Sequence, residues 1–463
     1  MTLIKSISGI RGTIGGQPEE NLTPIDAVKF AAAYGTYIKA NTQASSINIV
    51  VGRDARISGE MIQSLVTETL IGMGINIIDL GLSTTPTVEM SVVSENAQGG
   101  IILTASHNPK QWNALKLLNE AGEFLDAEAG AQILSLVEEN AFEFATVDHL
   151  GHKRSVENAI TAHIEQILAH PLINLPAIKA AEFTAVVDGV NSVGGIAIPQ
   201  LLEAIGVSCI PLYCDPTGHF PHNPEPLKEH LGDLSKLVVT HKADMGIVVD
   251  PDVDRLAFMD EKGEMFGEEY TLVACADYTL SKKPGNTVSN LSSTRALRDV
   301  TEAAGGSYFA AAVGEVNVVT KMKEVNAVIG GEGNGGVIDP QLHYGRDALI
   351  GVVLFLSLLA ERKCSVSELK ASYPSYFMSK GKIQLEKGLD VDALLNTMAN
   401  LYKEESPLLI DGVKIDFSEG WVHMRKSNTE PIIRVYSEAS SQQEADALTQ
   451  RFSDELLKIS TNL

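Results

Sequence analysis

Short hydrophobic segments rich in β-branched residues alternate with longer amphipathic segments over most of this chain. In the N-terminal part, the pattern predicts strands at 47–51, 75–81 and 99–104, with helices near 58–73 and 87–95 between them. An earlier helix from Pro24 to about Lys39 is expected because Thr23 can cap it and proline suits the first helical position. This alternation is typical of a mostly parallel sheet covered by helices.

The same order of elements begins again twice farther along the chain. The second unit spans 183–213 and continues to a strand at 246–250. The third starts near Asn286, with strands at 286–293, 307–313 and 327–329 and helices at 294–304 and 317–323. We therefore expect three α/β units of similar plan, although no repeat of the sequence itself accompanies them.

The last part of the chain follows another pattern. From about Gly381 it predicts a strand, a helix over 390–405, strands near Val413 and Trp421, a strand at 432–438 and a long helix from Ser441. This arrangement indicates an α+β domain. We expect four domains, at 1–152, 153–256, 257–372 and 373–463.

Length and charge restrict the function classes. With 463 residues and about 150 residues per domain, about three domains are expected, and two or four are also admissible. A content of 44% hydrophobic and 21% charged residues excludes disordered and fibrous proteins. The net charge of −23, from 36 Lys and Arg against 59 Asp and Glu, repels nucleic acid and anionic lipid, so neither is expected as a partner.

The sequence shows no signal peptide or membrane span. The longest apolar run, 348–360, has only 13 residues and is expected to be a buried helix. We therefore predict a cytoplasmic location. The four cysteines lack CxxC spacing, which predicts buried thiols rather than zinc ligands or disulfides; they are Cys209, Cys214, Cys275 and Cys364.

A loop containing Ser106 and His107 directly follows the strand predicted at 99–104. Ligand sites gather at the carboxyl ends of strands in open α/β sheets. Ser106 is a candidate nucleophile, and Lys116 is a candidate cation for holding an anion or moving a proton. The alternative is a plain turn, because serine and asparagine before proline are common in turns.

Three aspartates occupy alternate positions after an apolar strand at 245–249. If the loop curls, Asp250, Asp252 and Asp254 can direct their oxygens toward one divalent cation. An EF-hand is excluded because Arg255 stands where its turn needs glycine and both flanks are strand-like. Glu261, which would be the twelfth residue of an EF-hand loop, belongs instead to the turn of a predicted hairpin. The pattern favours an enzymatic Mg²⁺ loop over a solvated acidic turn.

A third loop, at 330–336, contains five glycines around Glu332 and Asn334. Glycine lets the backbone approach a ligand closely, and these two side chains can form hydrogen bonds with it. The loop is not a Walker A motif because no Gly-Lys-Ser/Thr follows. A tight connection without a ligand remains the alternative.

A fourth loop concentrates cations, hydroxyls and an amide at 425–431, with Arg434 beyond it. Guanidinium groups and turn N–H groups suit a phosphate dianion. A simple surface loop is the alternative. Phosphate and Mg²⁺ sites in one chain indicate phosphoryl transfer.

The four loops, in this order and over essentially the whole chain, resemble those of the α-D-phosphohexomutase superfamily. The phosphoserine, metal, sugar and phosphate loops of that family are similar to TASHNP, DPDVDR, GEGNGG and RKSNTEPIIR. GHFPHNPEP at 218–226 and Val313-Gly314-Glu315 also match, the latter at the second sugar-contacting loop. The resemblance implies a heart-shaped fold of three related mixed α/β sheet domains and a C-terminal α+β domain.

The resemblance also implies a role for each residue of these loops. Ser106 would carry the transferable phosphate and hold Mg²⁺ together with Asp250, Asp252 and Asp254. Proton transfer and charge stabilisation are implied for Arg11, His107, Lys116 and Arg255. Sugar contacts are implied for Gly314, Glu315, Glu332 and Asn334. Contacts to the phosphate that does not react are implied for Arg425, Ser427, Asn428, Thr429 and Arg434.

The implied mechanism is a two-step transfer of phosphate. Phospho-Ser106 would give its phosphoryl group to a hexose monophosphate. The resulting hexose 1,6-bisphosphate, which is also the activator, would rotate end for end in the cleft and return its other phosphate to Ser106. The C-terminal domain would act as a lid. The expected partner is a small sugar phosphate, and the expected assembly is a monomer or a homodimer.

Three segments depart from the usual family pattern: ISGIRG, WNALK and Asn334 in the sugar loop. GEGNGG is similar to the variant in archaeal-type members and in some bacterial chains labelled phosphoglucosamine mutase. We therefore expect interconversion of glucosamine 6-phosphate and glucosamine 1-phosphate, with a phosphoglucomutase/phosphomannomutase as the alternative. Further alternatives are a non-catalytic sugar-phosphate binding protein and a phosphatase. A Ser-His-Asp hydrolase is disfavoured because Ser106 has no Gly-x-Ser-x-Gly surroundings.

Overall fold

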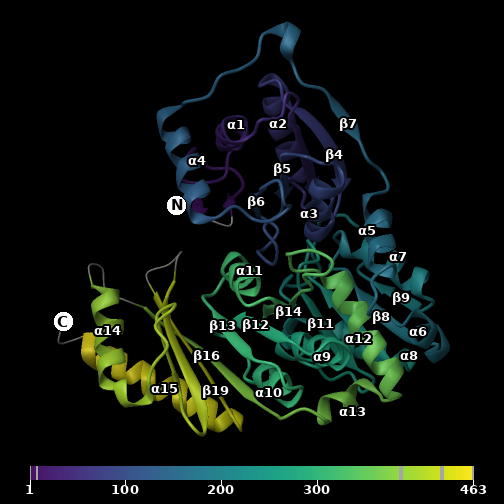
Figure 1. Cartoon of the computed structure of the whole chain (residues 1–463), viewed down its shortest axis with the longest axis vertical. Helices are drawn as coiled ribbons and strands as arrows, with labels where there is room; N and C mark the ends of the chain where they lie inside the picture. The colour runs from purple at the N-terminus through teal and green to yellow at the C-terminus, as the bar shows by residue number, and fades with distance from the viewer. Residues whose placement is uncertain (1, 7–8, 385–388, 428–431, 461–463) are drawn as a thin grey trace.

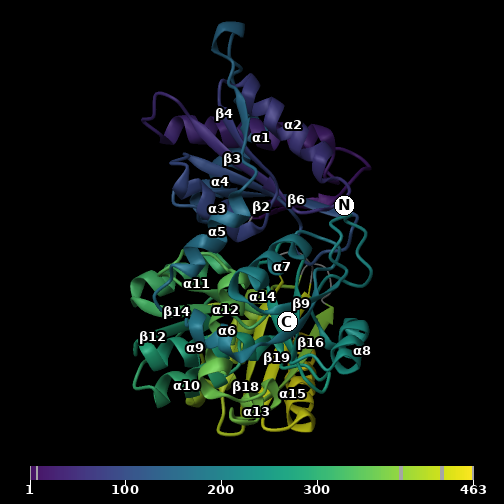
Figure 2. The ribbon, with the colours of Figure 1, turned by 90° about the vertical axis from the view of Figure 1, so that its right-hand side faces the viewer.

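Four β-sheets follow one another along the chain in the computed structural model, which describes residues 2–6, 9–384, 389–427 and 432–460 (Figure 1). In this view the first sheet lies at the top, the second and third lie below it, and the C-terminal sheet lies at the lower left. A view turned by 90° again places the first sheet above the others (Figure 2). Three mixed α/β units followed by an α+β domain confirm the predicted fold class.

The first unit is built on a seven-stranded sheet in the order β1-β2-β6-β5-β3-β4-β7. Its strands are β1 (Ile4–Ser6), β2 (Gly9–Thr13), β3 (Asn48–Arg53), β4 (Asn76–Leu82), β5 (Gly99–Leu103), β6 (Trp112–Leu118) and β7 (Lys153–Ser155). Its helices are α1 (Pro24–Asn41), α2 (Gly59–Gly72), α3 (Thr85–Ser94) and α4 (Ala127–Glu139), with a 3₁₀ turn at Val147–His149. The helix predicted from Pro24 is confirmed, and Thr23 and Asp26 cap it reciprocally.

The prediction of a mostly parallel first sheet was wrong. Strands β1, β2 and β6 run antiparallel to their neighbours, so the sheet is mixed. The difference arises because the chain turns back after the loop containing Ser106 and pairs as β6 with β5. That loop is therefore the turn of a β-hairpin.

The second and third units each carry a four-stranded sheet. The second contains β8 (Thr184–Asp188), β9 (Ser208–Leu212), β10 (Met245–Val249) and β11 (Leu256–Asp260), with α5 (Ala159–Leu168), α6 (Leu175–Ala181), α7 (Gly194–Ile205) and α8 (Gly232–His241) and a 3₁₀ turn at Lys228–His230. The third contains β12 (Asn286–Asn290), β13 (Tyr308–Ala311), β14 (Ala327–Glu332) and β15 (Gly336–Ile338), with α9 (Glu268–Lys282), α10 (Ala296–Ala303), α11 (Glu315–Glu324), α12 (Ala348–Arg362) and α13 (Val366–Ala371).

One strand arrangement recurs in all three units. A central strand, which is β3, β8 or β12, pairs in parallel with the next strand along the chain on one side and with the one after that on the other. In each unit a fourth strand returns antiparallel to the third strand of this set. The turn between the third and fourth strands holds the serine loop in the first unit, the aspartate loop in the second and the glycine-rich loop in the third. Three of the four chemically distinctive loops thus occupy equivalent positions in related units.

The C-terminal domain is an antiparallel sheet in the order β16-β19-β18-β17. Its elements are β16 (Phe377–Gln384), β17 (Val413–Asp416), β18 (Gly420–Lys426), β19 (Ile432–Ala439), α14 (Val391–Leu401) and α15 (Gln442–Ser460), with a 3₁₀ turn at Lys403–Glu405. Both helices pack into one hydrophobic cluster with the strands. The helix predicted over 390–405 ends earlier, at Leu401, and a separate short 3₁₀ turn follows at Lys403–Glu405.

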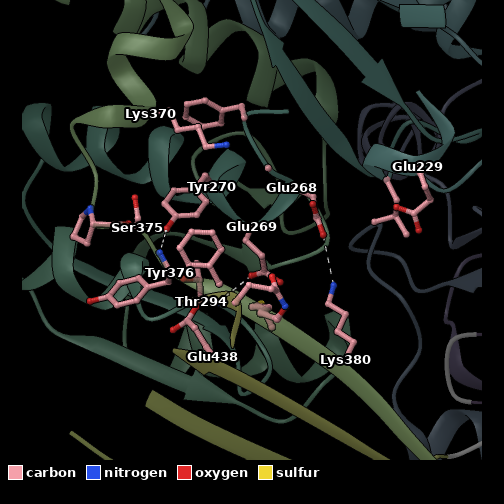
Figure 3. Close-up of a pocket in the computed structure, with 17 residues that line it drawn as sticks. Glu229, Glu268, Glu269, Tyr270, Thr294, Lys370, Ser375, Tyr376, Lys380 and Glu438 are labelled. Atoms are coloured by element: carbon pink, nitrogen blue, oxygen red, sulfur yellow. Dashed lines mark hydrogen bonds and ion pairs between the residues drawn. The ribbon is translucent and has the colours of Figure 1, made fainter. Parts of the chain in front are cut away.

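A pocket of about 470 Å³ lies where the third unit meets the C-terminal domain (Figure 3). The hydroxyl of Tyr270 donates to the carbonyl of Pro374 at 2.7 Å and accepts from the backbone N–H of Tyr376 at 2.9 Å. Glu269, in the pocket wall, lies against Gly333, where a Cβ atom would come within 1.9 Å of its Oε2. The pocket therefore borders the back of the glycine-rich loop.

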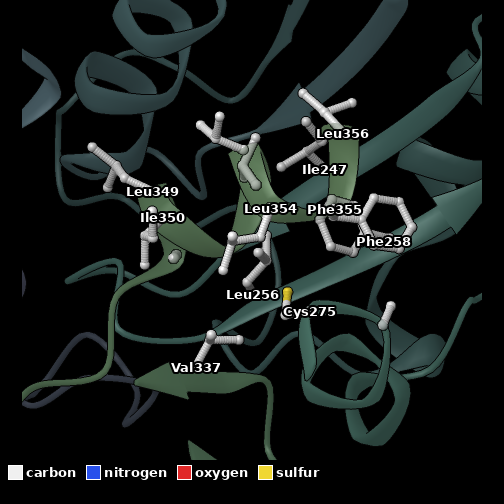
Figure 4. Close-up of a cluster of buried hydrophobic side chains, with 14 of the residues drawn as sticks. Ile247, Leu256, Phe258, Cys275, Val337, Leu349, Ile350, Leu354, Phe355 and Leu356 are labelled. Carbon is white, nitrogen blue, oxygen red and sulfur yellow. The ribbon is translucent and has the colours of Figure 1, made fainter. Parts of the chain in front are cut away.

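Helix α12 lies at the centre of the largest hydrophobic core, which the second and third units share. Its residues 348–359 are all buried, which confirms the predicted buried helix. The rings of Phe258 and Phe355 stack with their centroids 3.7 Å apart (Figure 4). Among the described residues, no helix is long and apolar enough to cross a bilayer.

The prediction of four buried thiols was correct only for Cys275. Cys209, Cys214 and Cys364 are half-buried, because β9, the turn after it and the end of α12 lie at the edges of their units. All four, which lie among the described residues, are free thiols.

Candidate active site

The serine loop and the aspartate loop meet in the folded chain. The hydroxyl of Ser106 donates a hydrogen bond to Oδ2 of Asp250 at 2.6 Å, although 144 positions separate the two residues. One oxygen from each of Asp250, Asp252 and Asp254 lies within 4.8 Å of the others. The structure therefore brings together the predicted serine and the three predicted metal ligands.

The serine loop is supported by Arg56, which is almost completely buried. Its guanidinium group donates to four loop carbonyls, those of Ser106, Asn108, Pro109 and Trp112, and to the carboxylate of Asp54. Ser106 itself has a left-handed backbone with φ of 48°. A non-glycine residue in this conformation needs support from its surroundings, and the five hydrogen bonds of Arg56 provide it.

Arg56 and Asp54 were not predicted as site residues. They lie in the connection between β3 and α2, at the same edge of the sheet as the serine loop. The signal was a pair of charged residues in a turn at the carboxyl end of a buried strand. The segment 218–226, which matched the family, also reaches this place, because the ring of Phe220 lies 5.1 Å from the Arg56 guanidinium carbon.

We expect Arg56→Lys to lower the free energy of unfolding by about 2 kcal/mol, because a single ammonium group leaves buried loop carbonyls without donors. Urea unfolding monitored by circular dichroism measures the change. Arg154→Lys is the matched control, since Arg154 is about half exposed and pairs with Glu95 at the surface. Equal unfolding of wild type and Arg56→Lys would contradict the scaffold role.

The three aspartates are completely buried, so the alternative of a solvated acidic turn is wrong. Burial, together with the charges of Asp254 and Asp252, raises the pKa of Asp250 well above its usual value. Burial opposes the charged form of Asp254 as well, but Arg346 and Lys116 lie close enough to lower its pKa overall. Lys116 Nζ donates to Asp252 at 2.7 Å and to Asp254 at 3.3 Å.

Two oxygens of the cluster have the surroundings of metal ligands. Within the described part of the chain, Oδ1 of Asp252 and Oδ1 of Asp254 are buried and have no hydrogen-bond partner. Unpaired buried carboxylate oxygens are costly, and oxygen-only donor sets suit hard divalent cations. The residues therefore fit a divalent metal ion such as Mg²⁺. The flanks of the loop are the strands β10 and β11, as expected when the EF-hand was excluded.

Basic side chains surround the meeting point of the two loops. Arg11 on β2 lies near Arg255, Arg346 and Asp252. Its pKa is lowered mainly by burial and, to a smaller extent, by the positive charges of Arg255 and Arg346. Nδ1 of His107 lies 3.4 Å from the Ser106 hydroxyl. Burial and the charge of Arg255 lower the pKa of His107 well below its usual value, so its imidazole is neutral. The structure gathers all four predicted basic residues around Ser106.

The sugar-loop residues lie beside the aspartates. Glu332 accepts from the side chain of Asn290 at 2.8 Å and from the backbone N–H of Gly314 at 3.1 Å. The two segments predicted to contact the sugar are therefore linked directly. Asn334 accepts from the backbone N–H of Gly336 at 3.3 Å.

Arg346 connects the aspartate loop to both sugar-loop carboxylates. Its guanidinium group donates to Glu315 at 2.8 Å, to Glu332 at 3.0 Å and to Asp254 at 2.8 Å. Arg346 was not predicted, although the Arg-Asp pair directly before the longest apolar helix was a visible signal. One buried cation thus holds three buried carboxylates in a fixed arrangement.

The fourth loop is described only in part, because Asn428 and Thr429 lie outside the described residues. Arg425 and Arg434 are direct partners on the antiparallel strands β18 and β19. Nε of Arg425 donates to Asp411 at 2.9 Å, and the same carboxylate oxygen accepts from the backbone N–H of Val313 at 3.0 Å. The base of this loop is therefore connected to the second sugar-contacting segment. Ser427 donates its backbone N–H to Ile432 at 3.0 Å.

Comparisons with known proteins agree with this arrangement of loops. Models of phosphoglucomutase/phosphomannomutase α/β/α domains I, II and III match residues 3–144, 161–263 and 267–376, and the model of the C-terminal domain matches 381–455. A crystal structure of a phosphoglucomutase/phosphomannomutase family protein from Burkholderia thailandensis has a TM-score of 0.85 at 24% identity and covers 99% of this chain and 98% of that one.

Relatives with assigned names cover nearly the full chain. The protein named "Probable phosphoglucosamine mutase" in Methanopyrus kandleri is 32% identical over 96% of each chain. The protein named phosphoglucomutase/phosphomannomutase in Thermococcus kodakarensis is 35% identical over 94% of this chain and 95% of the relative. Because this identity extends across all four matched domains, the chain belongs to the phosphoglucomutase/phosphomannomutase family of the α-D-phosphohexomutase superfamily, a family of mutases that transfer phosphate within a sugar.

Proposed function

We propose that this phosphohexomutase is a phosphoglucosamine mutase, which interconverts glucosamine 6-phosphate and glucosamine 1-phosphate. The hydrogen bond of 2.6 Å from Ser106 to Asp250, inside a buried cluster of three aspartates, carries the chemical part of the proposal. The asparagine variant of the sugar loop and the name of the Methanopyrus kandleri relative support the choice of sugar.

Ser106 is the proposed carrier of the phosphoryl group. A phosphate on its oxygen would stand beside Asp250, Asp252 and Asp254, and these three carboxylates with an oxygen of that group would hold Mg²⁺. When bound, the ion would neutralise part of the phosphoryl charge and so favour transfer. The unpartnered oxygens of Asp252 and Asp254 support this assignment.

In the proposed first step, the bond between phosphorus and the Ser106 oxygen breaks while phosphorus bonds to the free hydroxyl oxygen of the sugar phosphate. His107, close to Ser106 and neutral, accepts the hydroxyl proton and passes it to the departing Ser106 oxygen, which becomes a hydroxyl again. Arg11, Lys116 and Arg255 place positive charge around the group in transfer. The second step reverses these changes at the other end of the sugar bisphosphate and restores the phosphoserine.

The rest of the substrate would contact the third unit and the C-terminal domain. Gly314, Glu315, Glu332 and Asn334 are the proposed sugar contacts. Like charges placed opposite each other on paired strands are unfavourable, and a phosphate between Arg425 and Arg434 would relieve that repulsion. Ser427, Asn428 and Thr429 complete the proposed phosphate site. The polar contacts between this domain and the third unit support the proposal that it closes as a lid.

Several further properties of this protein are also proposed. They are a domain division near residues 152, 256 and 372, activation by a hexose 1,6-bisphosphate, a cytoplasmic location, and a monomeric or homodimeric assembly. A small sugar phosphate is the proposed partner, without nucleic acid or membrane. The alternative sugar specificity, for glucose or mannose phosphates, is favoured by the name of the Thermococcus kodakarensis relative.

The decisive experiment compares substrates. Purified enzyme with Mg²⁺ and a trace of hexose bisphosphate is assayed on glucosamine 6-phosphate, glucose 1-phosphate and mannose 1-phosphate. We expect kcat/KM for the glucosamine phosphate to exceed the others by about a hundredfold, which is about 2.7 kcal/mol of discrimination. Similar or higher values for glucose or mannose phosphate would assign the alternative. Release of inorganic phosphate would favour a phosphatase, and no reaction would favour a binding protein.

A further inference from the structure

A second cluster of possible metal ligands lies outside the four loops. It joins His163 on α5 to His343 and Asp347, which precede α12. Nε2 of His163 lies 2.9 Å from Oδ2 of Asp347, and Nε2 of His343 lies 3.4 Å from the same oxygen. The other oxygen of Asp347 accepts from backbone N–H groups at the start of α12, which leaves Oδ2 directed at the two imidazoles.

The second nitrogen of each imidazole also faces a polar group. Nδ1 of His163 lies 2.9 Å from the hydroxyl of Thr87, and Nδ1 of His343 lies 3.4 Å from Oε2 of Glu89. The two rings stand at 88° to each other. Histidines that bind metals characteristically have their second nitrogen held by a carboxylate or another oxygen, which orients the ring. Both histidines have this arrangement.

Glu89 provides an independent observation. Its carboxylate is buried, and within the described ranges neither oxygen meets the criteria of a hydrogen bond, although Oε2 faces Nδ1 of His343 at 3.4 Å. Glu89 and Asp347 thus place two carboxylates in one buried cluster. A divalent cation would balance the charges of Asp347 and Glu89.

We propose that His163, His343 and Asp347 bind a Zn²⁺ ion, with Thr87 and Glu89 orienting the two imidazoles. Two imidazole nitrogens and one carboxylate oxygen suit zinc, whereas an all-oxygen cluster suits magnesium. Bond lengths near 2.0 Å in a tetrahedral site separate the ligand atoms by roughly 3.3 Å, so His163 and Asp347 need to move apart by only a few tenths of an ångström.

The proposed ion has a structural role. Thr87 and Glu89 belong to α3 of the first unit, His163 to α5 of the second, and Asp347 caps α12 in the shared core. The ion would join these three parts directly behind the active site.

The test measures metal content and needs no turnover, so its failure is distinct from failure of the mutase assignment. Protein prepared with Zn²⁺ and dialysed against metal-free buffer is analysed by inductively coupled plasma mass spectrometry. We expect about one zinc per wild-type chain. His343→Gln should lose it, and Glu89→Gln should weaken Zn²⁺ binding about 10- to 100-fold in a chelator competition assay.

Two controls separate this site from others. His170→Gln should keep the zinc, because His170 is buried beside Asp339 and outside the cluster. Asp252→Asn should also keep it, because Asp252 belongs to the other cluster and contributes no ligand to this one. Circular dichroism confirms that each variant is folded. The proposal is overturned if metal-free wild type binds no zinc in the competition assay, or if His343→Gln and Glu89→Gln bind it as wild type does.

Discussion

Replacing Ser106 with alanine is expected to abolish mutase turnover, with a loss of about 10³-fold or more in kcat. Without the hydroxyl oxygen, no phosphoenzyme can form, and neither the aspartates nor the surrounding cations can replace the missing acceptor. The fold should persist, because the change removes one hydrogen bond to Asp250, worth about 1 kcal/mol. A coupled assay on glucosamine 6-phosphate measures the rate.

Intact-protein mass spectrometry after incubation with a hexose bisphosphate supplies the second readout for this variant. Wild type should gain one phosphoryl group, and Ser106→Ala should gain none. Ser94→Ala is the matched control, since Ser94 is exposed at the end of α3 and should keep both the rate and the phosphorylation. If Ser106→Ala retained the wild-type rate, the phosphoserine mechanism would be wrong.

Local elements could be predicted wherever their signals are local. The helix α1 has its cap at Thr23 and its proline at the first position, and the structure places it from Pro24 to Asn41. The apolar run that became α12 is buried throughout, as expected. Strand β6 was not predicted, because only its pairing with β5 defines this segment as a strand.

The positions of the site loops were predictable for a topological reason. Ser106 and Asp250 each follow an apolar strand, and the carboxyl ends of such strands are where ligand sites form. The sequence does not reveal that the loops occupy equivalent hairpin turns in related units. That relation depends on strand pairing between residues far apart in the chain, and the pattern of hydrophobic positions carries no information on it.

The residues that support the site were the ones missed. Arg56 is 52 positions from Asn108 and Arg346 is 92 positions from Asp254, so these contacts exist only in the folded chain. Buried arginines cannot be distinguished from surface arginines by residue type, since arginine is usually exposed. Their importance became clear only from the carbonyls and carboxylates that they satisfy.

Arg346 provides the second large expected effect. Changing it to glutamine should lower the free energy of unfolding by about 3–5 kcal/mol, because buried ion networks lose this much when one partner is removed. Three buried carboxylates, those of Asp254, Glu315 and Glu332, would lose their shared cation. Urea unfolding monitored by tryptophan fluorescence and circular dichroism measures the loss.

Arg362→Gln is the control for this change, since Arg362 pairs with Asp277 near the surface and should cost about 1 kcal/mol or less. Arg346→Lys tests the geometry separately from the charge. Lysine keeps a cation but cannot reach three carboxylates with a planar group, so the sugar-contacting segments should be held less well. We expect a raised KM for the sugar phosphate with a smaller change in kcat. If Arg346→Gln unfolded like Arg362→Gln, the carboxylates would have to be held by other groups, and the role assigned to Arg346 would be wrong.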